Sequence, residues 1–340
     1  MNSERARATM AYLGLALALA AAFSASLALG AVRLSPAQAL AALFRAAGNQ
    51  AGPIAMIAKL RLARACLAAA VGASLAASGA VFQGLFRNPL ADPYVIGSSG
   101  GSAFGAVLAI SFGSGAGALG FSAIGLSAFA GGLAATLVVY FVAGATRLRS
   151  DASSLLLAGT ALGSLFSALV SIVLALKDKD LHQAWFWLLG GFSGRGLPEL
   201  AAAAPAMVIG FAAALASSRA LDLLSVGDEE ATSLGMRPVR TRFIVGGFAA
   251  LSVSAAVALS GAIGFVGLVS PHLARRLVGP RHALLIPAAA LTGATLLVVA
   301  DTVARTAFAP IEMPVGAMTA LIGAPFFIYK IAKGGLGGTR

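Results

Sequence analysis

Long apolar stretches separated by short polar ones run along most of the chain. Each stretch is close to the ~20 residues that an α-helix needs to cross the hydrocarbon core of a membrane. The runs are continuous rather than alternating, which favours membrane-spanning helices over a β-barrel. We therefore predict about ten spans, at residues 10–30, 62–82, 95–112, 119–145, 153–176, 198–217, 243–261, 263–279, 283–303 and 314–332.

The longest charged interval between these spans runs from Arg219 to Arg242. A charged side chain at the centre of a membrane helix costs ~2.5–3.5 kcal/mol or more, so this interval must form a polar loop outside the hydrocarbon. Acidic residues from Asp228 to Glu230, with Gly235 after them, mark the two ends of a short helix. A solvated helix is the simpler interpretation, and a helix that docks on another protein is the functional one.

Composition indicates a protein with many membrane spans. Of the 340 residues, 59% are hydrophobic and only 11% are charged, whereas soluble domains carry roughly 25% charged residues. We expect a single transmembrane domain over residues 1–340, with 219–242 as a loop inside it.

The basic residues indicate the orientation of the chain in the membrane. If the N-terminus is cytoplasmic, 15 of the 24 Lys and Arg fall in inside loops and 9 outside, in agreement with the positive-inside rule. Their scatter between spans argues against nucleic-acid binding.

Three local features complete this outline. The run 10–30 follows two arginines as a signal peptide would, but it is long enough to span a membrane, and we treat it as the first helix. In the segment 31–61, Ser35 and Pro36 predict the start of a short amphipathic helix. The one cysteine, Cys66, lies in an apolar run and allows neither an intrachain disulfide nor a cysteine-based metal cluster.

Residues 83–105 contain turn signals followed by a glycine pattern. Pro89 and Pro93 cannot continue a helix, so a tight turn should join two spans here. Gly97, Gly101 and Gly105 recur every four residues, which predicts a smooth helix face for close packing. A phosphate-binding loop is not indicated, because no Gly-Lys-Ser/Thr follows and no soluble strand precedes.

Ser99 offers an enzymatic alternative. Residues 97–100 (GSSG) fit the Gly-x-Ser-Gly pattern around an intramembrane serine nucleophile, which needs a histidine base within hydrogen-bond reach. His182 and His282 lie at predicted membrane edges, and His272 follows a proline. Helix packing explains this four-residue match more simply.

The short loop after the fifth span could be read as a metal site. It contains Asp178, Asp180 and His182, but two lysines stand among them, so a solvated loop is the better interpretation. Trp185 and Trp187 follow directly. They suit an aromatic belt at the membrane surface, or a rim that a docking partner covers.

Three arginines fall on the outside against the positive-inside rule. Arg61 and Arg64 lie at the outer end of the second span, and Arg305 lies at that of the ninth, after Asp301, with which it could pair. A basic outer patch of this kind would match and orient an acidic protein partner. The predicted spans lack a paired interior carboxylate network, which disfavours an ion-driven secondary transporter.

The sequence also contains two short segments that resemble each other. Residues 78–81 (SGAV) precede 88–90 (NPL), and residues 260–263 (SGAI) precede 271–273 (PHL). Five predicted spans separate the two copies, and an odd number would place them in opposite directions across the membrane. We therefore predict an inverted internal repeat, which is common among transporters.

Eight segments together resemble the permease subunits of the iron-siderophore, haem and vitamin B12 family of ATP-binding-cassette (ABC) importers, the FecCD-like family with the type II fold. They occur in the family's order over nearly the whole chain. The segments are LRLAR (60–64), SGAVFQGLFRNPLADPYVIGSSGG (78–101), SSLLLAG (153–159), WFWLLGGFSG (185–194), LLSVGDEEATSLG (223–235), GAIGFVGLVSPHLARRLVG (261–279), ADTVAR (300–305) and EMPVGAMTALIGAPFF (312–327).

The resemblance implies a fold and a set of partners. It implies an all-α membrane protein with ten helices per subunit, arranged as a homodimer around a central pathway in the bacterial inner membrane, with both termini cytoplasmic. It further implies two cytoplasmic ABC ATPase subunits, which bind ATP and Mg, and a periplasmic substrate-binding protein. This chain itself is expected to hold no cofactor or metal and to carry out no catalysis.

The resemblance also implies roles for particular residues. By position, Arg61, Arg64 and Arg305 match outer arginines that receive acidic residues of the binding protein. Asn88 and Leu90 match the cytoplasmic gate. The segment 221–235 matches the coupling helices, and the residues expected at the ATPase are Gly227, Asp228, Glu229, Glu230, Ala231, Leu234 and Gly235.

A second gate element matches Ser153 at the start of the fifth span. Two departures accompany these matches. Ala152 stands where the family can carry a hydroxyl, and Ala63 replaces a proline that many members have between the two arginines.

We therefore expect a permease that moves a metal chelate, a ferric siderophore, haem or cobalamin, from periplasm to cytoplasm by alternating access. No short motif distinguishes among these cargoes. The alternatives from other classes are an intramembrane serine hydrolase using Ser99 and an ion-driven secondary transporter.

Overall fold

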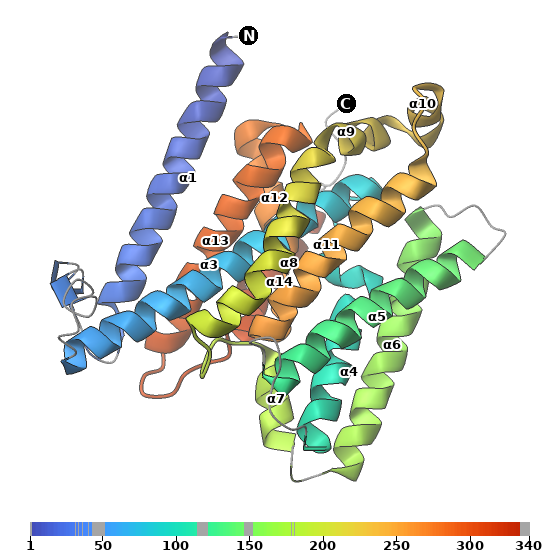
Figure 1. Ribbon diagram of the computed structural model, residues 1–340. Helices are drawn as coiled ribbons and strands as arrows, with labels where there is room; N and C mark the ends of the chain where they lie inside the picture. The colour runs from blue at the N-terminus through green and yellow to red at the C-terminus, as the bar shows by residue number, and fades with distance from the viewer. Residues whose placement is uncertain are drawn as a thin grey trace.

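Helices make up all the regular structure in the described part of the chain (Figure 1). The computed structural model describes residues 2–30, 32, 34–35, 37–39, 41–42, 52–113, 122–145, 152–177, 179 and 181–333. The helices are α1 (Asn2–Ala28), α3 (Pro53–Phe86), the 3₁₀-helix η1 (Pro93–Ile96), α4 (Ser98–Ser111), α5 (Ala123–Ala145), α6 (Ala152–Leu176), α7 (Leu181–Leu189), α8 (Leu197–Ala216), α9 (Ser218–Val226), α10 (Asp228–Ser233), α11 (Pro238–Ser260), α12 (Val266–Val278), α13 (His282–Thr306) and α14 (Val315–Ala332).

The all-helical membrane fold predicted from the apolar pattern is confirmed. Each of the ten predicted spans corresponds to a helix, namely α1, α3, α4, α5, α6, α8, α11, α12, α13 and α14. Among the described residues, seven helices are long and apolar enough to cross a membrane by themselves. Two of the others, α4 and α12, have only 14 and 13 residues, because each begins after a break in the chain rather than at a membrane surface.

The helix α3 begins earlier than its apolar pattern predicts. It starts at Pro53, so Lys59 and Arg61 lie on the helix and not before it, and Arg64 lies well inside the helix rather than at its end. The extension packs through alanines: Ala55 and Ala58 form a small buried cluster with residue 42. The predicted short helix before it is also supported, since Ser35 and Gln38 exchange backbone-to-side-chain hydrogen bonds of 2.9 and 3.1 Å in a capping box.

Close contact between α3 and α13 organises the centre of the bundle. At their crossing, a Cβ added to Gly72 would lie 2.3 Å from the carbonyl oxygen of Gly293, and a Cβ on Gly293 would lie 2.3 Å from that of Gly72. The two backbones can therefore approach only because both positions lack a side chain. The predicted glycine face of α4 behaves in the same way against α5, at Gly101 and Gly105.

The two halves of the predicted repeat run in opposite directions. The end of α3 lies beside the start of α11, because the Arg242 Nε donates a hydrogen bond to the Leu85 carbonyl at 3.2 Å. Each helix is followed by a break and then a short helix, α4 or α12. The Tyr94 hydroxyl joins the two breaks, since it donates to the Ile263 carbonyl at 3.0 Å and accepts from the Ile263 N–H at 3.1 Å.

The bundle has two polar ends, which we name by the short helices found there. The α10 end contains α9, α10 and the N-terminal end of α1, and the α7 end contains α7 and the start of α3 (Figure 1). Because α3 has 34 residues, it extends ~51 Å at 1.5 Å per residue and reaches both ends.

The glycine contact generates a first prediction. Substitution Gly72→Val should lower the free energy of unfolding by about 1–3 kcal/mol, because the new side chain meets the backbone of α13 and neither helix can retreat without losing other contacts. The midpoint of thermal unfolding in detergent measures this. Gly163→Ala on α6 is the control, since nothing lies within 4 Å of its added Cβ. Equal losses for the two variants would contradict the packing argument.

Candidate functional site

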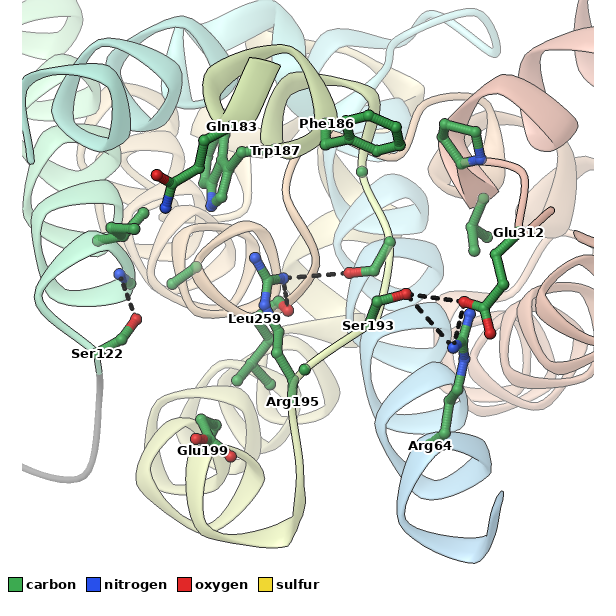
Figure 2. Close-up of a pocket in the computed structure, with 18 of the residues that line it drawn as sticks. Arg64, Ser122, Gln183, Phe186, Trp187, Ser193, Arg195, Glu199, Leu259 and Glu312 are labelled. Atoms are coloured by element: carbon green, nitrogen blue, oxygen red, sulfur yellow. Dashed lines mark hydrogen bonds and ion pairs between the residues drawn. The ribbon is translucent and has the colours of Figure 1, made fainter. Parts of the chain in front are cut away.

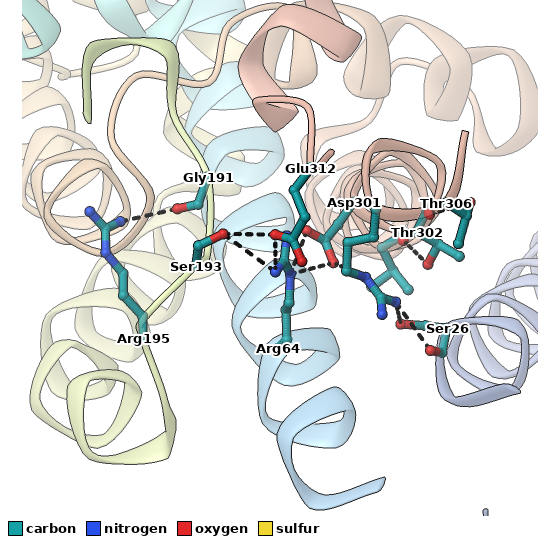
Figure 3. Close-up of polar contacts among 11 residues, drawn as sticks. Ser26, Arg64, Gly191, Ser193, Arg195, Asp301, Thr302, Thr306 and Glu312 are labelled. Carbon is teal, nitrogen blue, oxygen red and sulfur yellow. Dashed lines mark hydrogen bonds and ion pairs between the residues drawn. The ribbon is translucent and has the colours of Figure 1, made fainter. Parts of the chain in front are cut away.

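A buried carboxylate joins two of the predicted outer arginines at the α7 end (Figure 3). Asp301 of α13 has a side chain only 1% exposed. Arg64 Nε lies 2.9 Å from its Oδ1, and Arg305 Nε lies 3.2 Å from its Oδ2. The expected pairing of Arg305 with Asp301 is confirmed, but the sequence did not indicate that Arg64 shares the same partner.

An exposed glutamate completes this network at the surface. Arg64 Nη1 donates to Glu312 Oε2 at 2.9 Å, and the Ser193 hydroxyl donates to the same oxygen at 2.9 Å. Burial acts to raise the pKa of Glu312, but the hydrogen bond and charge of Arg64 outweigh it and hold that pKa below its ordinary value. The Arg64 guanidinium thus links α3, α13 and the segment that precedes α14.

Arg61, the third predicted docking arginine, caps a neighbouring helix. Its Nη1 donates to the Leu27 carbonyl at 2.9 Å, and its Nη2 donates to the Val32 carbonyl at 2.7 Å. These carbonyls lie at and just beyond the end of α1, where no intrahelical donor is left for them. Arg305 reaches the same helix, since its Nη2 donates to the Ser26 hydroxyl at 2.9 Å.

The three arginines nevertheless share one cavity. A hollow of about 450 Å³ is lined by Arg61, Arg64 and Arg305 together with Arg195 and Glu312. The arginines are largely covered, with a side-chain exposure of 13% for Arg64 and 8% for Arg305. An acidic group from a partner would therefore have to enter this hollow rather than meet the arginines on a flat surface.

A second cavity, of about 510 Å³, lies beside the first one and shares Arg64, Arg195 and Glu312 with it (Figure 2). The helix α7 covers it with Gln183, Phe186 and Trp187. Inside, Arg195 donates from Nη1 to the carbonyls of Gly191 and Leu259 and so caps the end of α11. Burial lowers the pKa of Arg195 to about 10, against the raising effect of nearby Glu199. The guanidinium remains charged at neutral pH.

At the α10 end, Asp228 anchors the predicted loop helix. Arg242 is 2% exposed, and its Nη1 and Nη2 donate to the two Asp228 carboxylate oxygens at 2.8 and 2.6 Å. Arg87, at the end of α3, lies 3.5 Å from the same carboxylate. The hydrogen bond from Arg242 holds the pKa of Asp228 below its ordinary value, so the stabilisation is present at neutral pH and is lost as the pH falls through that lowered pKa.

The rest of α10 is turned outward. The helix runs from Asp228 to Ser233, which confirms the expected short helix, and Gly235 follows with a positive φ of 82°. Ala231 is buried, whereas Glu229, Glu230 and Leu234 are exposed. Gly227, at the N-cap, lies next to the folded-back Glu230 carboxylate.

Asp222 of the helix α9 contacts the start of α13. Asp222 Oδ1 accepts hydrogen bonds from the His282 backbone N–H at 2.9 Å and lies 2.6 Å from His282 Nδ1. Asp222 therefore caps the start of α13. This contact was missed at the sequence level, because sixty positions separate the two residues and no local pattern joins them.

The turn predicted to form part of the gate follows α3. Asn88 Oδ1 accepts from the Leu90 N–H at 2.9 Å, which closes the turn after α3. The following helix η1 packs on α6, whose second residue is Ser153. The side chain of Ser153 lies outside the described part of the structure, so the gate assignment stays a prediction.

The enzymatic and metal-site alternatives gain no geometric support. Ser99 makes no hydrogen bond to a histidine in the described part of the chain, and His282 is engaged by Asp222 at the α10 end. No group of three metal-ligating side chains was found among the described residues. Asp178 and Asp180 lie outside those residues, so the structure does not place them.

One signal in the sequence bears on both ion pairs. Arg64 lies inside the predicted span 62–82, and Arg242 directly precedes the predicted span 243–261. An ionised group inside or at the edge of a span is expected to face a partner within the bundle. The sequence shows that a partner is needed without showing which carboxylate supplies it.

Comparisons with known proteins agree with this architecture. The model of the FecCD transport family matches residues 17–333. The Cobalamin import system permease protein BtuC of Halobacterium salinarum is 44% identical over 278 residues, covering 81% of this chain and 73% of that protein. The Hemin transport system permease protein HmuU of Yersinia pestis is 40% identical over 279 residues, covering 81% of this chain and 82% of that protein.

A solved structure shares the whole fold. It is described as an inward-facing conformation of a metal-chelate type ABC transporter, and it superposes with a TM-score of 0.82 at 35% identity, covering 96% of this chain and 99% of that one. A family match across nearly all spans, together with relatives at this identity, shows the kinship of the whole membrane domain. The chain belongs to the FecCD transport family.

Proposed function

We propose that this chain is the transmembrane permease subunit of an ABC importer that moves a metal chelate across the membrane by alternating access. The relatives are named for different cargoes, which include cobalamin, hemin and ferric dicitrate. A ferric siderophore, haem or cobalamin is therefore the cargo class that we propose. ATP and Mg are bound by separate ATPase subunits, and this chain carries out no hydrolysis.

The anchored and outward-turned helix α10 is the observation that carries this proposal. Its inner side is fixed to α11 and α3 through Asp228, Arg242 and the Leu85 carbonyl. Its outer side exposes Glu229 and Glu230, and the residue that ends it, Leu234, is 68% exposed. A short helix that is rigidly joined to the bundle and presents two carboxylates and one leucine on its free side is suited to enter a groove on another protein and to transmit motion from it.

A route from this helix to the gate follows from the same contacts. The Asp228 carboxylate also lies beside Arg87, and Arg87 is directly followed by the gate residue Asn88. A displacement of α10 by the ATPase would therefore act on the turn that joins α3 to η1. Residues 219–242 serve as the coupling loop of a single membrane domain in this proposal.

The opposite end suits a substrate-binding protein. The cavity that contains Arg61, Arg64 and Arg305 would accept acidic side chains of such a protein, and Trp185 is exposed on the same end. The α7 end is then periplasmic and the α10 end cytoplasmic, as the positive-inside rule favours. Two copies of the chain around one pathway, in the inner membrane, complete the importer.

The first functional prediction concerns the free side of α10. Leu234→Asp should strongly reduce recovery of the cognate ATPase when the two are co-expressed and the permease is purified, because a charge replaces an apolar contact at the groove. Arg219→Gln, an exposed change on neighbouring α9, should leave recovery as in the wild type. Undiminished ATPase recovery with Leu234→Asp would contradict the coupling role.

The second prediction concerns the anchor of α10. Asp228→Asn should cost about 1–3 kcal/mol of stability, because buried Arg242 loses its charged partner. In assembled transporters it should also lower the amount of cargo moved per ATP hydrolysed, since α10 is no longer fixed to α11 and α3. Transport into proteoliposomes measured beside phosphate release tests this, and an unchanged ratio would argue against transmission through Asp228.

The third prediction concerns docking. Arg305→Gln should weaken binding of the substrate-binding protein to the permease in nanodiscs, because the hollow loses one positive charge. Lys177→Gln, an exposed lysine near α7, is the matched control. ATPase recovery reports whether the variant still folds. Equal binding by the two variants, with normal ATPase recovery, would remove Arg305 from the docking site.

A further inference from the structure

Two cavities follow one another along the seam between α1, α12 and α13. The first has a volume of about 200 Å³ and is lined by Arg7 of α1, Leu277 at the end of α12, and Arg281 at the start of α13. The second has a volume of about 410 Å³ and is lined further along the same helices by Leu15, Leu273 and Leu296, with α14 as its fourth wall.

The first cavity is basic and lies at the α10 end. Arg7 Nη2 donates to the Arg276 carbonyl at 3.0 Å, which fixes its guanidinium at the rim. Arg276 and Arg281 are exposed beside it. Within the described residues none of these three arginines has a carboxylate partner. The pocket therefore presents positive charge that no described carboxylate neutralises.

The second cavity is apolar and offers no free hydrogen-bonding group from its threonines. The hydroxyls of Thr292, Thr295 and Thr319 each donate to a carbonyl of their own helix, at 2.8 to 3.0 Å. The remaining lining residues are apolar or glycine. A hydrocarbon chain can occupy such a groove without leaving any polar group unpaired.

The near end of the groove lies within one membrane leaflet of the basic cavity. Along α13 the basic cavity ends at Leu284, and the groove extends from Thr292 to Val303. At 1.5 Å per residue the groove begins ~12 Å from the basic end and ends ~28 Å from it. One leaflet of the hydrocarbon core is ~15 Å deep, so an acyl chain of a lipid held at its headgroup would enter the near end of the groove, at Thr292 and Leu296.

We propose that this seam binds one anionic phospholipid, with its phosphate at Arg7 and Arg281 and one acyl chain in the groove. Basic pockets between membrane helices at the headgroup level attract anionic lipids in general. A second copy of this chain is the competing occupant of the groove. It fits less well, because a symmetric contact there would bring two sets of unpaired arginines towards the same interface.

Headgroup recognition is tested with purified protein that has been stripped of lipid by detergent. Phosphatidylglycerol, phosphatidylcholine or glycerol 1-phosphate is added, and the thermal unfolding midpoint and retained lipid by native mass spectrometry are recorded. We expect saturable stabilisation and retention with phosphatidylglycerol only. Stabilisation by glycerol 1-phosphate at the same concentration would show a phosphate site and overturn the lipid proposal.

The arginines are tested by matched pairs. Arg7→Gln with Arg281→Gln should weaken phosphatidylglycerol binding by about 25-fold, since each arginine near anionic headgroups contributes roughly fivefold. Arg219→Gln with Arg240→Gln removes the same charge at the same end and should leave binding unchanged. An equal loss in both pairs would reduce the effect to general electrostatic attraction and contradict a built site.

The groove is tested independently of the arginines. Leu296→Trp should fill its near end and displace the acyl chain, so phosphatidylglycerol retention falls, while Leu17→Trp on the exposed face of α1 should have no effect. If Leu296→Trp leaves retention unchanged, the proposal fails, and disruption of dimers by the same variant would assign the groove to a second copy. None of these measurements depends on the importer function.

Discussion

Asp301 is buried between Arg64 and Arg305, and the arrangement of the central helices depends on it. A lone carboxylate at 1% exposure in an apolar bundle would be strongly unfavourable, and removing one partner from a buried pair typically costs about 3–5 kcal/mol. The pairing therefore fixes α3 against α13 at the α7 end. It also leaves Arg64 able to hold Glu312 at the surface, and Arg305 able to hold the end of α1.

A second network of the same kind stands at the opposite end of α3. There the buried cation is Arg242, and its partner Asp228 is half exposed at the start of α10. The charge of a short surface helix is thus tied to the core, whereas at the α7 end the core carboxylate is paired with two largely covered arginines. One continuous helix of 34 residues, α3, reaches both networks.

This arrangement reconciles structural and functional roles for the outer arginines. Arg61, Arg64 and Arg305 all have partners within the chain, yet they line a common hollow. Because their positions are fixed before any partner arrives, an acidic side chain would meet preorganised guanidinium groups and would lose less entropy in ordering them. The same contacts give these residues a structural role beside the docking role that we propose.

The apolar pattern of the sequence determined the number, order and approximate limits of the ten spans, because each span must bury about the same length of hydrocarbon. It also located the loop helix at 228–233 and the turn at Asn88, where prolines, glycines and charges act locally. It did not place the start of α3, since Lys59 and Arg61 precede the apolar run and resemble loop residues in the sequence alone.

Only the tertiary structure decided those partners. Asp301 lies 237 positions from Arg64, and Asp222 lies 60 positions from His282, so no local periodicity could pair them. The hydrophobicity of a segment depends only on its own residues, so it can be read directly from the sequence. The choice of a charge partner depends on which segments lie side by side, and this is settled when helices pack through close contacts such as that between Gly72 and Gly293.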